Sequence, residues 1–226
     1  MHISMRFRDE IFLTLTAALG VISTYFALVA SPAEVEMGDY VRILYFHLPT
    51  AIICYVSLGI SLVAGIAFLW KKNEKFDALS SSAAMIGIVY GAVTLVTGAV
   101  WAKVTWGVYW NWDPRETTTL ILWLGYLGYF LLRMSIDNPE RRSSISAVYN
   151  VIVFLTVPLS YLSFILWPSL HPSLTSGGGL GLTTIMVETL VMNAVVGILF
   201  YVWMIRTAYE NSLRNTLSND SERGNN

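Results

Sequence analysis

The chain has 226 residues, of which 55% are hydrophobic and 13% are charged, and its formal net charge is −1. Soluble domains carry about 25% charged residues, so this composition excludes an ordinary soluble domain and predicts an integral membrane protein. Long apolar runs without a two-residue period favour helical spans over a closed barrel. Cys54 is the only cysteine, which excludes an internal disulfide and any CxxC or CxxCH motif.

The apolar runs predict an all-α bundle of six transmembrane helices, because one span needs roughly 20 residues. The predicted spans are residues 11–30, 50–70, 78–102, 114–133, 147–167 and 182–206. Residues 1–206 form a single membrane domain, and residues 207–226 form a polar, flexible cytoplasmic tail. The fifth span is expected to kink near Pro158, and the run Gly177–Gly179 helps to separate it from the sixth.

The first span has one alternative interpretation, as a cleaved signal peptide. The apolar core of a signal peptide is normally about 7 to 15 residues long, whereas the uncharged run here covers residues 11–30. An uncleaved membrane anchor is therefore favoured.

The start of the fourth span is the best-defined local signal in the chain. Asp113 suits the N-cap, Pro114 suits the first helical position, and Glu116 lies where a capping box places an acid. Asp113 either serves only as this cap or also orders a site. Upstream, a short surface helix is expected to bend at Pro49 into the second span, with His47 at the bend.

The basic residues are distributed unevenly over the two predicted faces. An even number of spans leaves both termini on one side, and that side receives eleven of the fourteen basic residues: Arg6, Arg8, Lys71, Lys72, Lys75, Arg133, Arg141, Arg142, Arg206, Arg214 and Arg223. Arg42, Lys103 and Arg115 fall on the other side. The positive-inside rule therefore predicts cytoplasmic termini and an external face between the third and fourth spans.

Four of the eight tryptophans lie at the end of the third span and in the connection that follows it. Trp and Tyr often form an interfacial belt at a membrane surface, and this alternative stays open. A belt needs neither Gly107 nor flanking charges, however. Trp106 and Trp110 are four residues apart and would share one face of a helical turn. With Tyr109 and Trp112, they would form a flat surface for a planar apolar ligand.

His47 and His171 are expected in external loops, each beside a proline. Two imidazoles and an aromatic surface fit haem, whereas a structural zinc site takes four ligands. Arg115 is the best placed external cation for the haem propionates, because it lies in the first turn of the fourth span. The alternative role for Arg115 is a salt bridge to Asp113 or Glu116.

The run from Trp106 to Thr117, WGVYWNWDPRET, resembles the WWD motif of haem-handling proteins of cytochrome c maturation. Together with six predicted spans and a histidine on either side of the motif, the chain resembles the CcmC family. The resemblance implies an external haem b site in a bacterial inner membrane. Its implied axial ligands are His47 and His171. The implied haem-binding residues are Trp106, Gly107, Tyr109, Trp110, Trp112, Asp113 and Arg115.

The resemblance also implies partners besides the lipid bilayer. Haem would be delivered to the periplasmic haem chaperone CcmE, in a complex with the small membrane protein CcmD and the ABC transporter subunits CcmA and CcmB. No nucleic-acid partner is expected. No Walker motif is present in this chain, so ATP hydrolysis by that route would belong to the partners.

Two other functions remain as alternatives. The first is a haem-ligating synthetase of the same WWD group. By the same resemblance, however, a synthetase would be a longer chain with additional histidines inside the membrane. The second is a transporter whose tryptophans form only a belt. A transporter is expected to carry polar or broken helices near the midplane of the membrane, and here only Glu188 and Pro158 meet that description.

Overall fold

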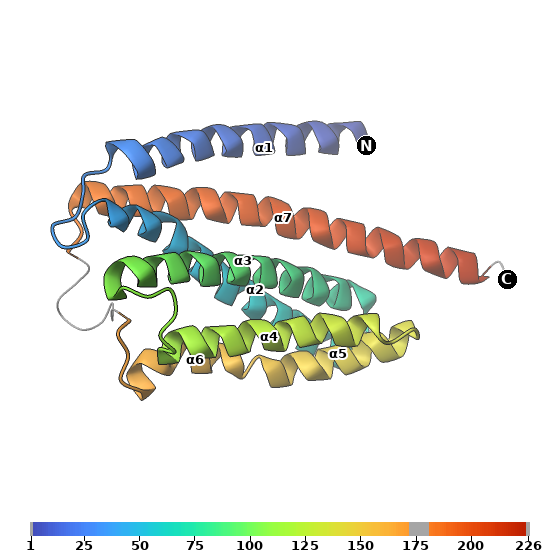
Figure 1. The fold of residues 1–226 in the computed structure, drawn as a ribbon. Helices are drawn as coiled ribbons and strands as arrows, with labels where there is room; N and C mark the ends of the chain where they lie inside the picture. The colour runs from blue at the N-terminus through green and yellow to red at the C-terminus, as the bar shows by residue number, and fades with distance from the viewer. Residues whose placement is uncertain (1, 172–180, 225–226) are drawn as a thin grey trace.

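The computed structural model describes residues 2–171 and 181–224, and within them the chain is helical (Figure 1). An isolated bridge between Glu34 and Gly38 is the only β-pairing in that part of the chain. The all-α fold class is therefore confirmed. The predicted separator Gly177–Gly179 lies outside the described residues.

The helices follow one another through short connections. In chain order they are α1 (His2–Tyr25), the π-helical turn η1 (Phe26–Ala30), the 3₁₀ turn η2 (Asp39–Ile43), α2 (Leu44–Lys71), α3 (Glu74–Trp106), α4 (Pro114–Met134), α5 (Pro139–Val153), α6 (Thr156–Leu166) and α7 (Thr184–Gly224). Helix α7 continues through most of the predicted polar tail. The flexibility of that tail stays a prediction.

Five described helical stretches are long and apolar enough to cross a membrane: Asp9–Ala30, Asp39–Lys71, Glu74–Trp106, Pro139–Leu166 and Thr184–Arg214. They correspond to five of the six predicted spans. Helix α4 corresponds to the other and has 21 residues. Its sequence is less apolar, because it begins PRETTT and carries glycine and tyrosine further along.

The helices run roughly along one direction, and both ends of the chain lie at the same end of the bundle (Figure 1). The connection between α3 and α4, the beginning of α2 and the end of α6 lie at the opposite end. Helix α2 packs mainly on α3, and α4 packs on α5 and α6. Gly87 allows the close approach of α2 and α3, since a Cβ there would lie 2.5 Å from Leu58 Cδ2.

Two prolines have different effects on their helices. Helix α2 begins at Leu44 and continues through Pro49, so the expected short helix and the second span form one helix, and the bend at Pro49 stays a prediction. Pro49 is buried in the second turn, where one carbonyl group loses its usual helical partner but the helix is not interrupted. The kink near Pro158 is confirmed, because the helix breaks between α5 and α6, where Phe154 O accepts from Val157 N at 2.9 Å.

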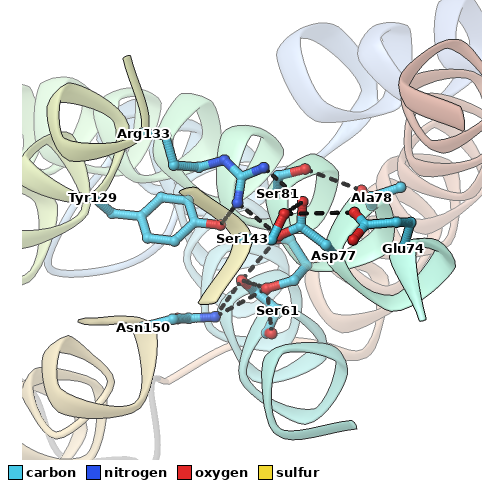
Figure 2. A network of polar contacts seen from close by, with 10 residues as sticks. Ser61, Glu74, Asp77, Ala78, Ser81, Tyr129, Arg133, Ser143 and Asn150 are labelled. Carbon is cyan, nitrogen blue, oxygen red and sulfur yellow. Dashed lines mark hydrogen bonds and ion pairs between the residues drawn. The ribbon is translucent and has the colours of Figure 1, made fainter. Parts of the chain in front are cut away.

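A buried polar network joins four helices at the end of the bundle where the termini lie (Figure 2). Arg133 on α4 forms an ion pair with Asp77 on α3 at 2.7 Å, and Ser143 on α5 donates to the same carboxylate at 2.9 Å. Asn150 on α5 donates to Ser61 on α2 at 2.9 Å. These bonds join α2 and α3 to α4 and α5 at the end of the bundle away from the tryptophan-rich segment.

Candidate functional site

An open pocket lies between the beginning of α2, the end of α3, the beginning of α4 and the end of α6. It leaves about 1210 Å³ free of protein atoms, its open mouth included. Its wall contains Leu44, His47, Leu48, Ala51, Tyr55, Thr94, Leu95, Gly98, Ala99, Trp101, Trp106, Trp110, Arg115, Glu116, Thr119, Tyr161, Phe164 and His171. Most of these side chains are apolar or aromatic, as in typical ligand pockets.

His47 reaches the pocket from the first turn of α2, so its predicted location in a loop is wrong. The helix begins before Pro49 and thereby includes His47. The imidazole Nδ1 lies 2.9 Å from Thr97 Oγ1 on α3. A Cβ at Gly98 would lie 3.2 Å from His47 Cε1. The ring is therefore packed directly against α3.

His171 reaches the same pocket from the segment that follows α6. The carboxylate of Asp113 holds this segment, since it accepts from Ser169 Oγ at 2.9 Å and from Leu170 N at 2.8 Å. Asp113 also caps α4 by accepting from Arg115 N at 2.9 Å. It is only 6% exposed and does not line the pocket. Asp113 thus acts both as the predicted cap and as a link between the tryptophan-rich segment and the segment of His171.

The tryptophan-rich segment divides into pocket residues and surface residues. Trp106 and Trp110 line the pocket, but they do not share a helical face as expected, because α3 ends at Trp106 and Gly107 turns the chain with a φ of 81°. Trp112 packs edge-on against Trp110 at 5.9 Å between ring centroids and is 71% exposed. Tyr109 is also exposed. Gly107, Tyr109 and Trp112 therefore lie outside the pocket wall.

Arg115 lies on the pocket wall beside two aromatic side chains of α6. Its Nη1 donates to Tyr161 O at 3.2 Å, and its guanidinium lies 5.2 Å from the centroid of the Phe164 ring. Among the described residues, Arg115 forms no salt bridge with Asp113 or Glu116, which removes that alternative here.

Glu116 does not form the expected capping box. Its Oε2 accepts from Asn111 N at 3.1 Å instead of from the N-cap residue. The other oxygen, Oε1, is buried and has no hydrogen-bond partner in the described part of the chain. Glu116 as a residue also lines the pocket.

Several residues at the site were not predicted from the sequence. Gly98 lines the pocket and Thr97 contacts His47. Both lie in the third apolar run and show no local signal. Tyr161 and Phe164 are three residues apart near the end of the fifth span, and this aromatic spacing on one helical face could have indicated a second wall. Glu188 is exposed on α7 and does not line the pocket.

Metal chemistry is limited by the available donors. Within residues 2–171 and 181–224, no three His, Cys, Asp or Glu side chains come close enough to hold a metal ion. The described residues therefore offer no structural zinc site with four protein ligands. Two histidines in the lining of one pocket suit a metal ion that a non-protein ligand already binds. In haem, the porphyrin supplies those other ligands to the iron.

The fold and the pocket together define the class of protein: a helical membrane protein with an aromatic-lined pocket at one end of its bundle. The family model of CcmC, heme exporter protein C, matches residues 2–223. The chain therefore belongs to the CcmC family. This finding confirms the resemblance that the sequence around Trp106 indicates.

Individual relatives agree with the family match. Heme exporter protein C of Bradyrhizobium diazoefficiens is 30% identical over 200 residues, which cover 88% of this chain and 76% of the relative. The protein of the same name from Haemophilus influenzae is 28% identical over 221 residues, 95% of this chain and 87% of the relative. A ccmC-like mitochondrial protein of Marchantia polymorpha, named for cytochrome c biosynthesis, is 33% identical over 156 residues, 68% of this chain and 64% of the relative.

Proposed function

We propose that this chain binds haem b in the pocket and delivers it during the biogenesis of c-type cytochromes. One observation carries the proposal: the lining of a single pocket includes His47, His171, Trp106, Trp110 and Arg115. These residues come from three separate parts of the sequence: residue 47, residues 106–115 and residue 171. They combine two iron ligands, two flat apolar surfaces and one cation.

The residues of the pocket fit the parts of a haem. His47 and His171 would supply axial nitrogen ligands to the iron. Trp106 and Trp110 would contact the apolar porphyrin, and Arg115 would pair with a propionate. Bound haem supplies the iron that the two imidazoles hold, and the protein supplies its binding and orientation.

Non-covalent binding follows from the position of the single cysteine. Cys54 is buried in a core cluster with Leu58 and Tyr126 and does not line the pocket. The pocket wall therefore has no thiol that could form a thioether with a haem vinyl group. Axial bonds and contacts with the ring can be released, which suits a protein that passes its haem on.

The proposed topology has six crossings, with α4 as the one that is less apolar. Two features support this role for α4: its 21 residues are long enough for a span, and it packs on α5 and α6. Six crossings leave both termini and the basic connections in the cytoplasm. The pocket then opens on the periplasmic face of a bacterial inner membrane. Residues 1–206 would form one membrane domain, followed by the tail.

The proposed partners come from the family resemblance, and the names of the relatives support only a link to haem and cytochrome c biosynthesis. Several relatives are named heme exporter protein C, and one is named for cytochrome c biosynthesis. The periplasmic mouth of the pocket would present haem to the chaperone CcmE. CcmD and the ABC transporter subunits CcmA and CcmB would assemble with the chain in the membrane.

Purified protein titrated with haem tests the proposal. We expect the low-spin absorption spectrum of bis-histidine iron, and we expect His47→Ala and His171→Ala each to lose it, because each variant removes one axial ligand. His2→Ala is the matched control and should keep the wild-type spectrum. A wild-type spectrum in both pocket variants would contradict the assignment of the ligands.

The synthetase alternative requires a different measurement. A synthetase would attach haem covalently to a peptide that contains CxxCH, whereas a delivery protein would leave the haem extractable by acidified organic solvent. Covalent haem on the peptide after incubation with this chain alone would favour the synthetase.

Trp110→Ala should weaken haem binding about five- to tenfold, which corresponds to roughly 1 kcal/mol for one aromatic contact. The measurement is the dissociation constant from a haem titration followed by absorbance. Trp70→Ala is the matched control, because Trp70 is 85% exposed at the other end of α2. An unchanged dissociation constant in Trp110→Ala would favour the interfacial belt.

A further inference from the structure

We propose that Thr97 and Gly98 are positioning residues that fix the tautomer and the orientation of His47, so that its Nε2 is the atom that binds iron. This inference rests on the proposed haem function and deepens it. Neither residue belongs to a recognisable sequence motif. We infer both roles from the packing of the His47 imidazole against α3.

The hydrogen bonds of Thr97 determine which nitrogen of His47 carries the proton. The Thr97 hydroxyl lies 2.7 Å from Val93 O and 3.2 Å from Thr94 O. A carbonyl oxygen can only accept, so the single hydroxyl hydrogen of Thr97 is used toward one of these carbonyls. The contact of 2.9 Å between Thr97 Oγ1 and His47 Nδ1 must then have the imidazole as its donor.

A proton on Nδ1 leaves the lone pair of a neutral imidazole on Nε2. A ligating histidine commonly donates its other ring N–H to a partner, which fixes the tautomer and raises the basicity of the ligand. Here the partner is a hydroxyl that is itself anchored to its own helix. Without that acceptor, a fraction of the His47 rings would carry the proton on Nε2 and could not bind iron through that atom.

Gly98 fixes the position of the ring by leaving space for it. A Cβ at this residue would lie 3.2 Å from Cε1 and 3.8 Å from Nδ1 of His47. The first distance is shorter than ordinary van der Waals contact, so a methyl group would push the ring away from α3. The same movement would lengthen the bond from Nδ1 to Thr97. Packing of the His47 ring therefore explains why a glycine lies inside this helix.

The two histidines lie on different kinds of structure. His47 lies on a helix, where its side chain contacts Thr97, whereas His171 lies on an irregular segment whose Ser169 and Leu170 bond to Asp113. The role of Thr97 and Gly98 is therefore specific to one side of the proposed haem.

Two substitutions at Thr97 separate the hydrogen bond from the packing. Thr97→Val keeps the shape and removes the acceptor, whereas Thr97→Ser keeps the hydroxyl. We expect Thr97→Val to weaken haem binding about tenfold or more, as loss of a partner to a metal ligand commonly does, and Thr97→Ser to bind haem like the wild type. Equal haem affinities for Thr97→Val and the wild type would overturn the role of Thr97.

Gly98→Ala tests the space for the ring. We expect a loss of haem affinity of about tenfold together with a shift of the low-spin absorption bands, because the axial imidazole is displaced. Gly59→Ala is the matched control, since Gly59 lies on α2 and a Cβ there would meet nothing within 4 Å. The inference about Gly98 fails if Gly98→Ala and Gly59→Ala bind haem equally well.

A haem-free measurement reads the tautomer directly. In the uniformly ¹⁵N-labelled protein without haem, the His47 signals can be assigned by their loss in His47→Ala. We expect the nitrogen shifts of an Nδ1–H imidazole in the wild type and in Thr97→Ser, and a mixture of tautomers in Thr97→Val. An Nε2–H imidazole in the wild type would overturn the inference.

The same experiments distinguish failure of the inference from failure of the proposed function. If the wild type binds no haem, the haem function itself is wrong. If His47→Ala binds haem unchanged, the assignment of His47 as a ligand is wrong. If haem binding depends on His47 but not on Thr97 or Gly98, the function stands and this inference is wrong. The nitrogen shifts report on the tautomer in either case.

Discussion

Asp113→Ala is expected to lower the free energy of unfolding by about 4 kcal/mol or more and to abolish high-affinity haem binding. The substitution removes an N-cap, which costs about 1 kcal/mol. It also leaves Ser169 Oγ and Leu170 N without their buried, charged acceptor, and hydrogen bonds to charged groups contribute about 1.5 to 3 kcal/mol each. His171 then loses the bonds that hold its segment at the pocket.

The measurements for Asp113→Ala are thermal unfolding in detergent, followed by tryptophan fluorescence, and haem titration. Asn138→Ala is the matched control, because Asn138 caps α5 through Arg141 N at 2.9 Å and touches no part of the pocket wall. It should cost about 1 kcal/mol and leave haem binding unchanged. Haem affinity in Asp113→Ala equal to that in Asn138→Ala would contradict the link to His171.

Asp113→Asn divides the two roles of this side chain. Asparagine is as good an N-cap as aspartate, so the cap of α4 should survive. The amide places an NH₂ group where the second carboxylate oxygen accepts from Leu170 N, and two donors cannot bond to each other. Asp113→Asn therefore keeps the helix start and the acceptor for Ser169 Oγ, but it loses the bond to Leu170 N.

The sequence could predict what depends on local chemistry and on composition. The beginning of α4 at Pro114 follows from the residues that adjoin it, and five apolar stretches have the length and hydropathy of spans. The break before Pro158 follows from the missing N–H of that proline. Pro49 lies near the beginning of its helix, where a missing N–H disturbs less of the bonding pattern, and α2 continues through it.

The sequence could not predict contacts between distant spans. Thr97 is 50 residues from His47, and Ser169 is 56 residues from Asp113. Serine and threonine in an apolar helix usually bond to their own backbone, so their composition does not reveal a partner. The packing of α2 on α3, and of α6 beside α4, decides which hydroxyl meets which side chain. The sequence therefore indicated the two histidines, the tryptophans and Asp113, but not the contacts of Thr97 and Ser169 with them.

Arg133→Ala is expected to lower the free energy of unfolding by about 3 to 5 kcal/mol, the usual cost of removing one partner from a buried ion pair. Arg133 binds Asp77 through two parallel bonds of 2.7 and 2.8 Å, and their side chains are only 13% and 10% exposed. The variant leaves the carboxylate with the hydroxyl of Ser143 but without its cation (Figure 2). An uncompensated charge among four packed helices is the physical reason for the large effect.

Arg206→Ala is the matched control for this prediction. Arg206 pairs with Asp9 and Glu210, but it is 50% exposed, and exposed pairs contribute about 0 to 1 kcal/mol. Thermal unfolding of the haem-free protein compares the two variants. Equal unfolding temperatures would mean that the network in Figure 2 contributes little to holding α3, α4 and α5 together.

The double variant Asp77→Ala/Arg133→Ala completes a double-mutant cycle for this ion pair. Because it removes the carboxylate together with its cation, it should be less destabilised than the sum of the two single variants, with a coupling energy of about 0.5 to 3 kcal/mol. The network lies at the opposite end of the bundle from the pocket, so haem affinity below the unfolding temperature should stay at the wild-type value in all three variants. Loss of haem affinity while the protein remains folded would instead mean that the ion pair sets the separation of the helices at the pocket.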